Sequence, residues 1–367
     1  MTTRGVIWYA QPFAAVSRLF LAATMNSLRP TVLVTGASSG IGLATARLLA
    51  RRGYDVLAGV RCHRGRQTVQ DEGMQNLSPV WLDVTRDDHV EQLIAEIRQT
   101  RPDGLFGLVN NAGIGPPAAV ELSDIDEVRR ILEVNTLAPL RLIQACLPLL
   151  RDARGRIVNI SSLNGFVALP MVGAYSASKF ALEALCNSLR VELRPWKIPI
   201  SVVRPGQIGT PIFDKARTAL QERAQQIPPE LGYGYSKLYA RAAQFNERGA
   251  RAATPPEAVA RVVLRALEAR RPRLHYVVGA DARGLGLVQS LMPTRWFDAL
   301  VGALAGASPS PAVPERNGAA PATPPGAGDG SPAVPLDSRK RRSSWLALVQ
   351  HQARRTSTSS GAPNSPR

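Results

Sequence analysis

Cysteine and histidine are scarce in this chain of 367 residues. The three cysteines lie far apart in the sequence, at Cys62, Cys146 and Cys186. Such spacing matches neither a disulfide framework nor a zinc motif, and it favours a reducing compartment such as the cytoplasm. The four histidines are equally scattered, so the sequence gives no sign of a metal site.

The chain also lacks a long uninterrupted apolar run. Its apolar N-terminal stretch, residues 6–24, is broken by two polar residues, a proline and an arginine. A spanning helix needs about 20 predominantly apolar residues, and a signal peptide needs an unbroken apolar centre. We therefore interpret residues 1–29 as an N-terminal extension. It is either an amphipathic segment on a membrane surface or sequence upstream of a true start at Met25.

Acidic residues are fewer than basic ones, 28 against 45, and the net charge is +17. A charge of this sign assists association with anionic surfaces but does not determine the fold. From Ser308 onward the chain is rich in Pro, Ala, Gly and Ser, a composition typical of disorder. This tail contains a basic run, Arg339–Arg342, and an apolar run, Trp345–Val349. We expect weak contact with a membrane surface through the tail and no nucleic-acid binding, with a solvated tail as the alternative.

Between these ends, short apolar runs alternate with helix-favouring segments. The expected strands are residues 31–34, 55–60, 80–82, 107–109, 156–160, 200–203 and 275–278. The expected helices include residues 41–53, 90–98, 124–150 with a bend at Pro139, and 175–193. This alternation predicts an α/β fold, a Rossmann-like doubly wound parallel sheet of about seven strands in a single domain. We assign that domain to residues 30–285, followed by an apolar helical segment at 286–307 and the disordered tail at 308–367.

A glycine-rich turn follows the first expected strand. Residues 35–42 read Thr-Gly-Ala-Ser-Ser-Gly-Ile-Gly and lead into a helix. A strand, a turn and a helix N-terminus in this order present unpaired backbone N–H groups to the pyrophosphate of a dinucleotide. Gly36 permits the sharp turn, Gly40 lets a phosphate approach the backbone, and Gly42 lets the helix pack closely. An ordinary strand-to-helix turn is the alternative, because a glycine pattern alone is a weak signal.

The residue after the second expected strand indicates which dinucleotide binds. A carboxylate there accepts hydrogen bonds from free ribose hydroxyls, whereas an arginine accommodates a 2′-phosphate. The sequence has Arg61 at this point, with Arg64 and Arg66 close behind and no acid before Asp71. We therefore predict NADP as the cofactor. NAD is the alternative, in which case the arginines form a solvated basic loop.

Four polar residues in the second half of the domain predict proton transfer: Asn135, Ser162, Tyr175 and Lys179. The i, i+4 spacing places the phenol of Tyr175 and the ammonium group of Lys179 on one face of a helix. A free tyrosine has a pKa of about 10, and we expect the nearby cation to lower that pKa toward neutrality. Ser162 can then hold the substrate oxygen, and Asn135 can support a water-linked proton path to Lys179.

The same Tyr-x-x-x-Lys spacing occurs a second time, at Tyr233 and Lys237. This copy has Leu220 where a serine would be needed, and no expected buried strand precedes it. We interpret it as part of a loop on the substrate side and not as a second catalytic pair.

Together these motifs resemble the short-chain dehydrogenase/reductase family over residues 30–285. Further matches are Asn110 to Gly113 after the fourth expected strand and Pro205-Gly206 after the sixth. The resemblance implies that Asp83 contacts the adenine ring and that Thr210 holds the carboxamide of nicotinamide. The implied cofactor-binding set is Gly36, Ser38, Ser39, Gly40, Ile41, Gly42, Arg61, Asp83, Val84, Asn110, Ala112, Gly113, Tyr175, Lys179, Pro205, Gly206 and Thr210. Residues 57–61 and 191–203 look most like the retinol and 17β-hydroxysteroid dehydrogenase branch.

The resemblance implies an NADP-dependent alcohol dehydrogenase or carbonyl reductase, in which Lys179 also binds the ribose hydroxyls. Residues 211–255 are rich in aromatic and aliphatic side chains and match the part of the family that covers the substrate. These side chains imply that the substrate is a lipophilic alcohol or ketone. The alternative is that they only cover the apolar core of the domain. We also expect a homo-oligomer. The competing class is a non-catalytic nucleotide-binding or membrane-associated scaffold, which the presence of all four polar residues disfavours.

Overall fold

Seven parallel strands form one sheet in residues 29–305, the part of the chain that this computed structural model describes. Their order across the sheet is β3-β2-β1-β4-β5-β6-β7. The strands are β1 (Thr31–Val34), β2 (Asp55–Val60), β3 (Leu77–Trp81), β4 (Gly107–Asn110), β5 (Arg156–Ile160), β6 (Ile200–Pro205) and β7 (His275–Val278). The predicted fold, a doubly wound Rossmann-like sheet in a single domain, is confirmed.

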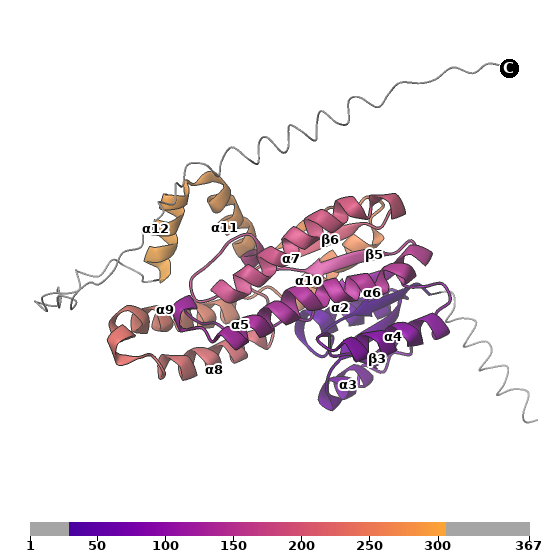
Figure 1. Ribbon diagram of the computed structural model, residues 1–367, viewed down its shortest axis with the longest axis horizontal. Helices are drawn as coiled ribbons and strands as arrows, with labels where there is room; N and C mark the ends of the chain where they lie inside the picture. Colours follow the sequence, from indigo (N-terminus) through magenta and orange to yellow (C-terminus); the bar gives the residue numbers. More distant parts are fainter. Residues whose placement is uncertain (1–28, 306–367) are drawn as a thin grey trace, which may run out of the picture. The chain divides into compact units, whose positions relative to one another are not determined.

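Helices cover both faces of this sheet (Figure 1). They are α2 (Gly40–Arg51), α3 (His63–Gln70), α4 (Asp87–Thr100), α5 (Ile125–Leu132), α6 (Ala138–Asp152), α7 (Gly173–Glu192), α8 (Ile212–Ala224), α9 (Gly232–Ala252), α10 (Pro256–Glu268), α11 (Ala280–Leu291) and α12 (Thr294–Ala305). Short helical turns are η1 (Val120–Leu122), η2 (Glu133–Leu137), η3 (Leu163–Gly165), η4 (Arg194–Trp196) and η5 (Pro229–Leu231).

Two apolar cores lie on opposite faces of the sheet. Leu33 packs with residues of α4, α6 and α7, whereas Val32 and Val34 pack with residues of α2 and α10. Successive side chains of a strand point to opposite faces, so a strand covered on both sides needs apolar residues throughout. β1 and β2 are buried along their whole length, which explains why both are apolar after their first residues, Thr31 and Asp55.

The long helix predicted over residues 124–150 is helical from Ile125 onward in the structure, but it contains a π-helical turn. α5 ends at Leu132, the π-helical turn η2 follows, and α6 begins at Ala138. The π-helical turn ends two residues before Pro139, the residue at which the bend is predicted. Pro139 lies in the first turn of α6 and has no N–H group to continue the helical hydrogen bonds. The interruption comes from η2, a kind of turn that is frequent at functional sites.

Two other expectations need correction. β3 spans Leu77–Trp81 instead of residues 80–82, and it accommodates Pro79 because it is an edge strand. The substrate-side loop predicted around Lys237 is helical, since it belongs to α9. Tyr235, Leu238, Tyr239 and Ala242 recur at helical spacing and pack in one apolar cluster with Leu220 of α8, and this packing stabilises the helix.

After β7 the chain forms α11 and α12, which correspond to the predicted apolar helical segment. The predicted boundary at residue 285 falls inside α11. Among residues 29–305, no helix combines the length and the apolar character needed to span a membrane. The expectations for the N-terminal extension and for the tail at Arg339–Arg342 and Trp345–Val349 lie outside the described residues.

Candidate active site

The four predicted catalytic residues converge beyond the carboxyl ends of β4 and β5. The side chains of Tyr175 and Ser162 share a hydrogen bond, and Nζ of Lys179 lies 5.8 Å from the centroid of the Tyr175 ring. A Cβ added to Gly113 would lie 3.2 Å from Oδ1 of Asn135 and 3.7 Å from Nζ of Lys179. Gly113 therefore sits against both groups, where a larger residue would crowd them.

Tyr175 and Ser162 are held by the backbone around them. Tyr175 lies in the first turn of α7 and is partly exposed. Ser162 follows β5 directly and caps η3, since its Oγ accepts a hydrogen bond of 3.1 Å from the N–H of Asn164. Gly115 makes room for the phenol ring, because a Cβ there would lie 2.6 Å from Cδ2 of Tyr175. No motif in the sequence pointed to Gly115.

Asn135 is fixed by three hydrogen bonds from the π-helical turn η2. Its Oδ1 accepts from the N–H of Ile114 at 2.9 Å, and its Nδ2 donates to the carbonyl of Ile114 at 2.7 Å. Nδ2 also donates to Oγ of Ser178 at 3.0 Å. The buried amide thus joins the loop after β4 to the turn of α7 that carries Tyr175 and Lys179.

The electrostatics of Lys179 and Tyr175 differ from the sequence expectation. Lys179 is buried, and its Nζ donates to the carbonyl of Ile160 at 2.9 Å. Burial lowers the pKa of Lys179 to about 8, although Cys186 and Glu183 oppose that shift. Burial also raises the pKa of Tyr175 above its ordinary value, and only the hydrogen bond with Ser162 opposes this. The predicted lowering of the Tyr175 pKa by Lys179 is wrong for this state, because desolvation dominates.

The glycine turn after β1 fits a dinucleotide. Gly36 and Gly40 have φ values of +63° and +54°, which favour glycine. A Cβ on Gly42 would lie 2.3 Å from the carbonyl oxygen of Gly36, so only glycine lets α2 start this close to the turn. Ser39 makes no side-chain cap, and the first turn of α2 has no acid. The N–H groups and the positive end of the helix dipole are therefore available to a pyrophosphate.

The other predicted cofactor residues surround this turn. Oγ1 of Thr35 accepts hydrogen bonds from the N–H groups of Asn111 and Ala112, at 2.9 and 3.0 Å. Asn110 is buried and donates to Oδ1 of Asn159 at 2.8 Å, so it joins β4 to β5. A Cβ on Gly40 would lie 2.9 Å from Cγ2 of Thr210. The loop after β6 thus meets the glycine turn.

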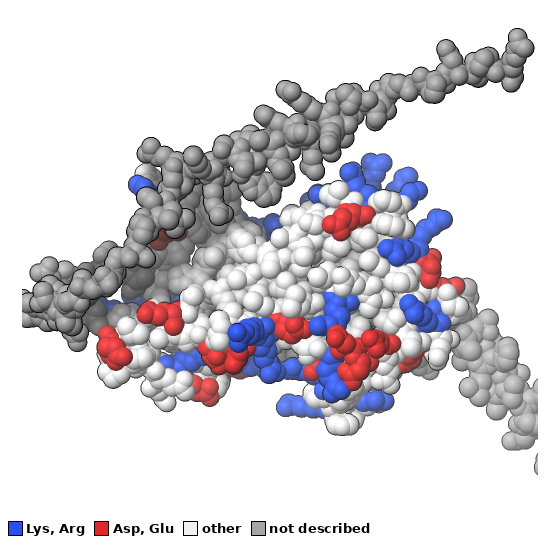
Figure 2. Space-filling view, viewed as in Figure 1, with Lys and Arg blue, Asp and Glu red and all other residues white. Residues whose placement is uncertain are grey.

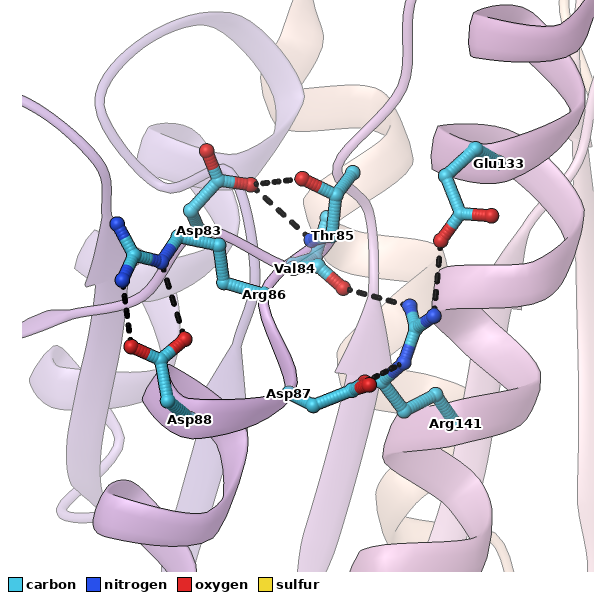
Figure 3. Close-up of polar contacts among 8 residues, drawn as sticks. All are labelled: Asp83, Val84, Thr85, Arg86, Asp87, Asp88, Glu133 and Arg141. Atoms are coloured by element: carbon cyan, nitrogen blue, oxygen red, sulfur yellow. Dashed lines mark hydrogen bonds and ion pairs between the residues drawn. The ribbon is translucent and has the colours of Figure 1, made fainter.

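The adenosine side of the predicted pocket lies at the ends of β2 and β3. Arg61 is exposed directly after β2. Burial alone would raise the pKa of Asp83, but hydrogen bonds from Thr85 and the charge of Arg61 outweigh it and lower that pKa. Thr85 donates to Oδ1 of Asp83 through its N–H at 3.0 Å and its Oγ1 at 2.8 Å (Figure 3). Ser38 and Ile41, two other residues predicted to bind the cofactor, make packing contacts within the protein. Ser38 lies against Gly65 of α3, and Ile41 packs on the apolar core.

The chain is similar to proteins of one known family. The model for short chain dehydrogenases matches residues 30–221. The chain belongs to the short-chain dehydrogenase/reductase family. It is 36% identical to a 3-amino-tetrahydro-pyrrolizinone reductase of Xenorhabdus hominickii, over 74% of this chain and 95% of that protein. Mouse retinol dehydrogenase 5 is also 36% identical, over 74% and 87% of the two chains.

Among solved structures, a short chain dehydrogenase from Burkholderia cenocepacia in complex with NADP matches with a TM-score of 0.57 and 25% identity. The match covers 74% of this chain and 97% of that one. These relatives, with a human 17-beta-hydroxysteroid dehydrogenase, place the chain near the retinol and hydroxysteroid branch. As a member of this family, the protein is an oxidoreductase that interconverts alcohols and carbonyls with a nicotinamide cofactor.

Two side chains that the sequence did not single out stabilise the segments predicted to bind the cofactor. Arg141 of α6 donates to the carbonyl of Val84 at 3.2 Å and to Glu133 at 2.9 Å, and it pairs with Asp87 (Figure 3). It therefore ties the predicted adenine segment to η2, the turn of Asn135. No sequence signal identified it, because its partners come from three separate elements.

Asp281 of α11 stabilises the loop after Pro205. Its Oδ2 accepts a hydrogen bond of 2.7 Å from the N–H of Gln207. A Cβ on Gly206 would lie 2.2 Å from the Asp281 carboxylate, so the glycine permits this contact. The N–H of Gly206 donates to the carbonyl of Val278 at 2.8 Å. α11 and β7 thus hold the loop that leads to Thr210.

The second Tyr-x-x-x-Lys copy belongs to α9, apart from α7, so Tyr233 and Lys237 come from a different element than the catalytic cluster. Within residues 29–305, no group of three or more His, Cys, Asp or Glu side chains is arranged to hold a metal ion. The cluster of Tyr175, Ser162 and Lys179 thus comes from α7 and the end of β5 alone.

Proposed function

We propose that this protein is an NADP-dependent alcohol dehydrogenase or carbonyl reductase that acts on a lipophilic substrate. The observation that carries the proposal is the cluster of Tyr175, Ser162 and Lys179 at the carboxyl edge of the sheet. The glycine turn that fits a dinucleotide lies at the same edge, where doubly wound folds bind ligands.

A bound nicotinamide dinucleotide supplies or accepts the hydride. In the reducing direction, Tyr175 donates its phenolic proton to the carbonyl oxygen of the substrate. The raised pKa of Tyr175 keeps the phenol protonated until that transfer. Ser162 donates a hydrogen bond to the same oxygen as negative charge develops there. Lys179, with a pKa of about 8, stabilises the phenolate and returns the proton through a path that Asn135 supports.

The choice of NADP over NAD rests on Arg61. It is exposed beside the Asp83 segment, and the charges of the two side chains act on each other. A guanidinium group at this place can pair with a 2′-phosphate through two parallel hydrogen bonds. The NADP bound to the related Burkholderia cenocepacia enzyme is consistent with this choice.

The lipophilic substrate is inferred from the segment between β6 and α10. α8 and α9 pack together over an apolar cluster that contains Leu220 and Tyr239. The same cluster includes Ala119 and Met171, which lie in the loops that follow β4 and β5. An apolar cover near the catalytic tyrosine favours substrates that gain free energy by leaving water.

We extend the proposal to self-association and location. Figure 2 shows few charged side chains over the middle of the face that carries α7, and the charges gather along its edges. Phe180, Val191 and Trp196 are exposed large apolar residues in α7 and η4, which supports contact with a second copy. We place the protein in the cytoplasm, in peripheral contact with a membrane through its basic tail.

Substitution of Tyr175 by phenylalanine tests the catalytic assignment. Tyr175→Phe removes the proton donor while the ring still packs against Gly115, so turnover of a lipophilic ketone should fall about 10²–10⁴-fold. The affinity for NADPH, measured by its fluorescence, should stay nearly unchanged. Tyr233→Phe, in the second copy of the motif, is the matched control and should change turnover little. A larger loss in Tyr233→Phe would overturn the assignment, and NADPH binding without turnover across a broad ketone panel would favour a scaffold.

A further inference from the structure

Glu183 is a buried carboxylate at the centre of a charged cluster that the mechanism above does not use. It is only 5% exposed. Arg204 of β6 donates to both of its oxygens, with Nε lying 2.9 Å from Oε1 and 3.0 Å from Oε2. Ser161 donates to Oε1 at 2.8 Å, and Nε2 of His275 in β7 lies 3.5 Å from Oε2. One carboxylate therefore joins α7 to three successive strands or their ends.

Burying such a cluster is costly, since the attraction within a buried ion pair seldom repays the loss of hydration. The surrounding residues nevertheless leave space for the charged cluster and contact it closely. A Cβ on Gly165 of η3 would lie 2.3 Å from Oγ of Ser161 and 2.7 Å from Oε1 of Glu183. The guanidinium carbon of Arg204 lies 4.7 Å from the centroid of the Phe166 ring. This close fit indicates a task beyond stability for the cluster.

The cluster lies next to two groups of the proposed mechanism. Glu183 follows Lys179 by four residues, which places both side chains on the same face of α7. Ser161, the hydrogen-bond donor to Glu183, precedes Ser162. Arg204 precedes Pro205, where the cofactor loop begins.

We propose that Glu183, paired with Arg204, is a positioning residue that holds Lys179 in its cationic form and fixes the segment of Ser162 against α7. The proposal rests on the roles given above to Lys179 and Ser162. In this assignment Glu183 acts only through these neighbours, because its contacts are with Ser161, Arg204 and His275. A cationic Lys179 is what the phenolate of Tyr175 requires.

The charges around Lys179 agree with this assignment. Burial lowers the pKa of Lys179, and Cys186 and Glu183 on α7 raise it. Burial raises the pKa of the Cys186 thiol to about 12, so this thiol stays neutral and supplies no anion. The β5 group that contacts Lys179 is the neutral carbonyl of Ile160, which accepts a hydrogen bond from Nζ. His275 contributes little positive charge, because burial and the charge of Arg204 lower its pKa. Glu183 is therefore the anion that favours a protonated Lys179.

NMR can follow the titration of Lys179 directly in the full chain. The sequence contains only five lysines, so lysine labelled at Cε gives few signals, and the Lys179→Met variant assigns the one needed. Glu183→Gln should lower the midpoint of Lys179 by about one pH unit, because it removes the nearby anion. Arg204→Gln removes the cation of the same cluster and should leave that midpoint unchanged or raise it.

A merely structural cluster predicts another pattern. Both charge variants would then loosen the site and move the midpoint of Lys179 in the same direction. Ser161→Ala, which removes a hydrogen bond without changing charge, should leave the midpoint in place. An unchanged midpoint in a folded Glu183→Gln protein, or a lowered one in Arg204→Gln, overturns the proposal. Since Arg204→Gln and Ser161→Ala test it separately, a Glu183 variant that fails to fold does not remove the test. No turnover is measured, so this result is independent of the Tyr175→Phe experiment.

Discussion

At the scale of single residues, Lys179 is a charged group in a place that disfavours charge. Its pKa in the folded protein is about 8, below the ordinary lysine value of 10.5. Below pH 8 the lysine is protonated in both the folded and the unfolded chain, so folding carries the whole cost of burying the charge. Between pH 8 and pH 10.5, Lys179 is neutral in the folded chain and still protonated in the unfolded chain, so the cost of burying the charge falls as the pH rises. Above pH 10.5 both chains are neutral at this residue, and the cost is absent.

Lys179→Met should therefore stabilise the protein while it abolishes turnover. We expect the free energy of unfolding at neutral pH to rise by roughly 1–3 kcal/mol, since an apolar side chain of similar length replaces a buried cation. The gain should shrink as the pH rises from about 8 toward 10.5. Urea unfolding of the native protein and of Lys179→Met at several pH values measures this difference in the free energy of unfolding. Equal stability at neutral pH would show that water hydrates the Lys179 ammonium group.

Arg61 decides the cofactor in our proposal. Arg61→Asp should weaken NADPH binding by about 2–3 kcal/mol, because a charge-assisted bond is lost and repulsion from a carboxylate is added. The ratio of kcat/KM for NADPH to that for NADH should fall accordingly. Arg261→Asp changes the same charge at an exposed position of α10 and should leave the ratio unaltered. Equal KM values for both cofactors in the native protein would contradict the premise.

At the scale of elements, α8 is attached to the loop after β4 by one arginine. Arg223 donates to the carbonyl of Pro117 at 2.6 Å and to both oxygens of Glu127 at 2.6 Å. Tyr235 of α9 adds a hydrogen bond to Glu121. Since Ile114 of the same loop holds Asn135, these contacts join the apolar cover to the catalytic side of the site.

Arg223→Ala should loosen this cover. We expect KM for a lipophilic ketone to rise about 5–50-fold, since a partly buried charge-assisted contact is lost. The affinity for NADPH should stay unchanged, because the contacts of Arg223 do not involve the glycine turn. Arg217→Ala, on the same helix, breaks only an exposed pair with Asp214 and is the matched control. Equal effects of the two variants on KM would argue against a covering role for α8.

The elements also show where sequence reasoning succeeds. The strands are short apolar runs whose local pattern fixes both their type and their place, so β1, β2, β5 and β7 fall at the predicted residues. The π-helical turn η2 has no such local pattern and was expected to be continuous helix. In the site, motif spacing predicted that Tyr175 and Lys179 would share a helix face. The partners of Arg141 and Glu183 are distant in sequence, and their positions depend on how whole elements pack.

At the scale of the whole molecule, exposed apolar residues precede a basic run in the last part of the sequence. In the described part, α11 and α12 expose Leu287, Leu291 and Trp296. Beyond it the sequence carries the basic run Arg339–Arg342 and the apolar run Trp345–Val349. Basic residues near anionic lipid contribute about 1 kcal/mol each, and neighbouring apolar side chains insert to a shallow depth. Either region could provide the membrane contact of the proposed function.

Deletion of residues 308–367 separates these two sources. Turnover of a soluble ketone should be unchanged, because none of the proposed site residues lies in the deleted segment. Full-length protein should sediment with anionic liposomes at low salt and be released at high salt, since screening weakens the attraction of the basic run. The truncated protein should stay in the supernatant. If it also sediments, the contact belongs to the domain, and Trp296→Ser in α12 should then release it. If neither form sediments at low salt, the protein does not use this tail to reach a membrane.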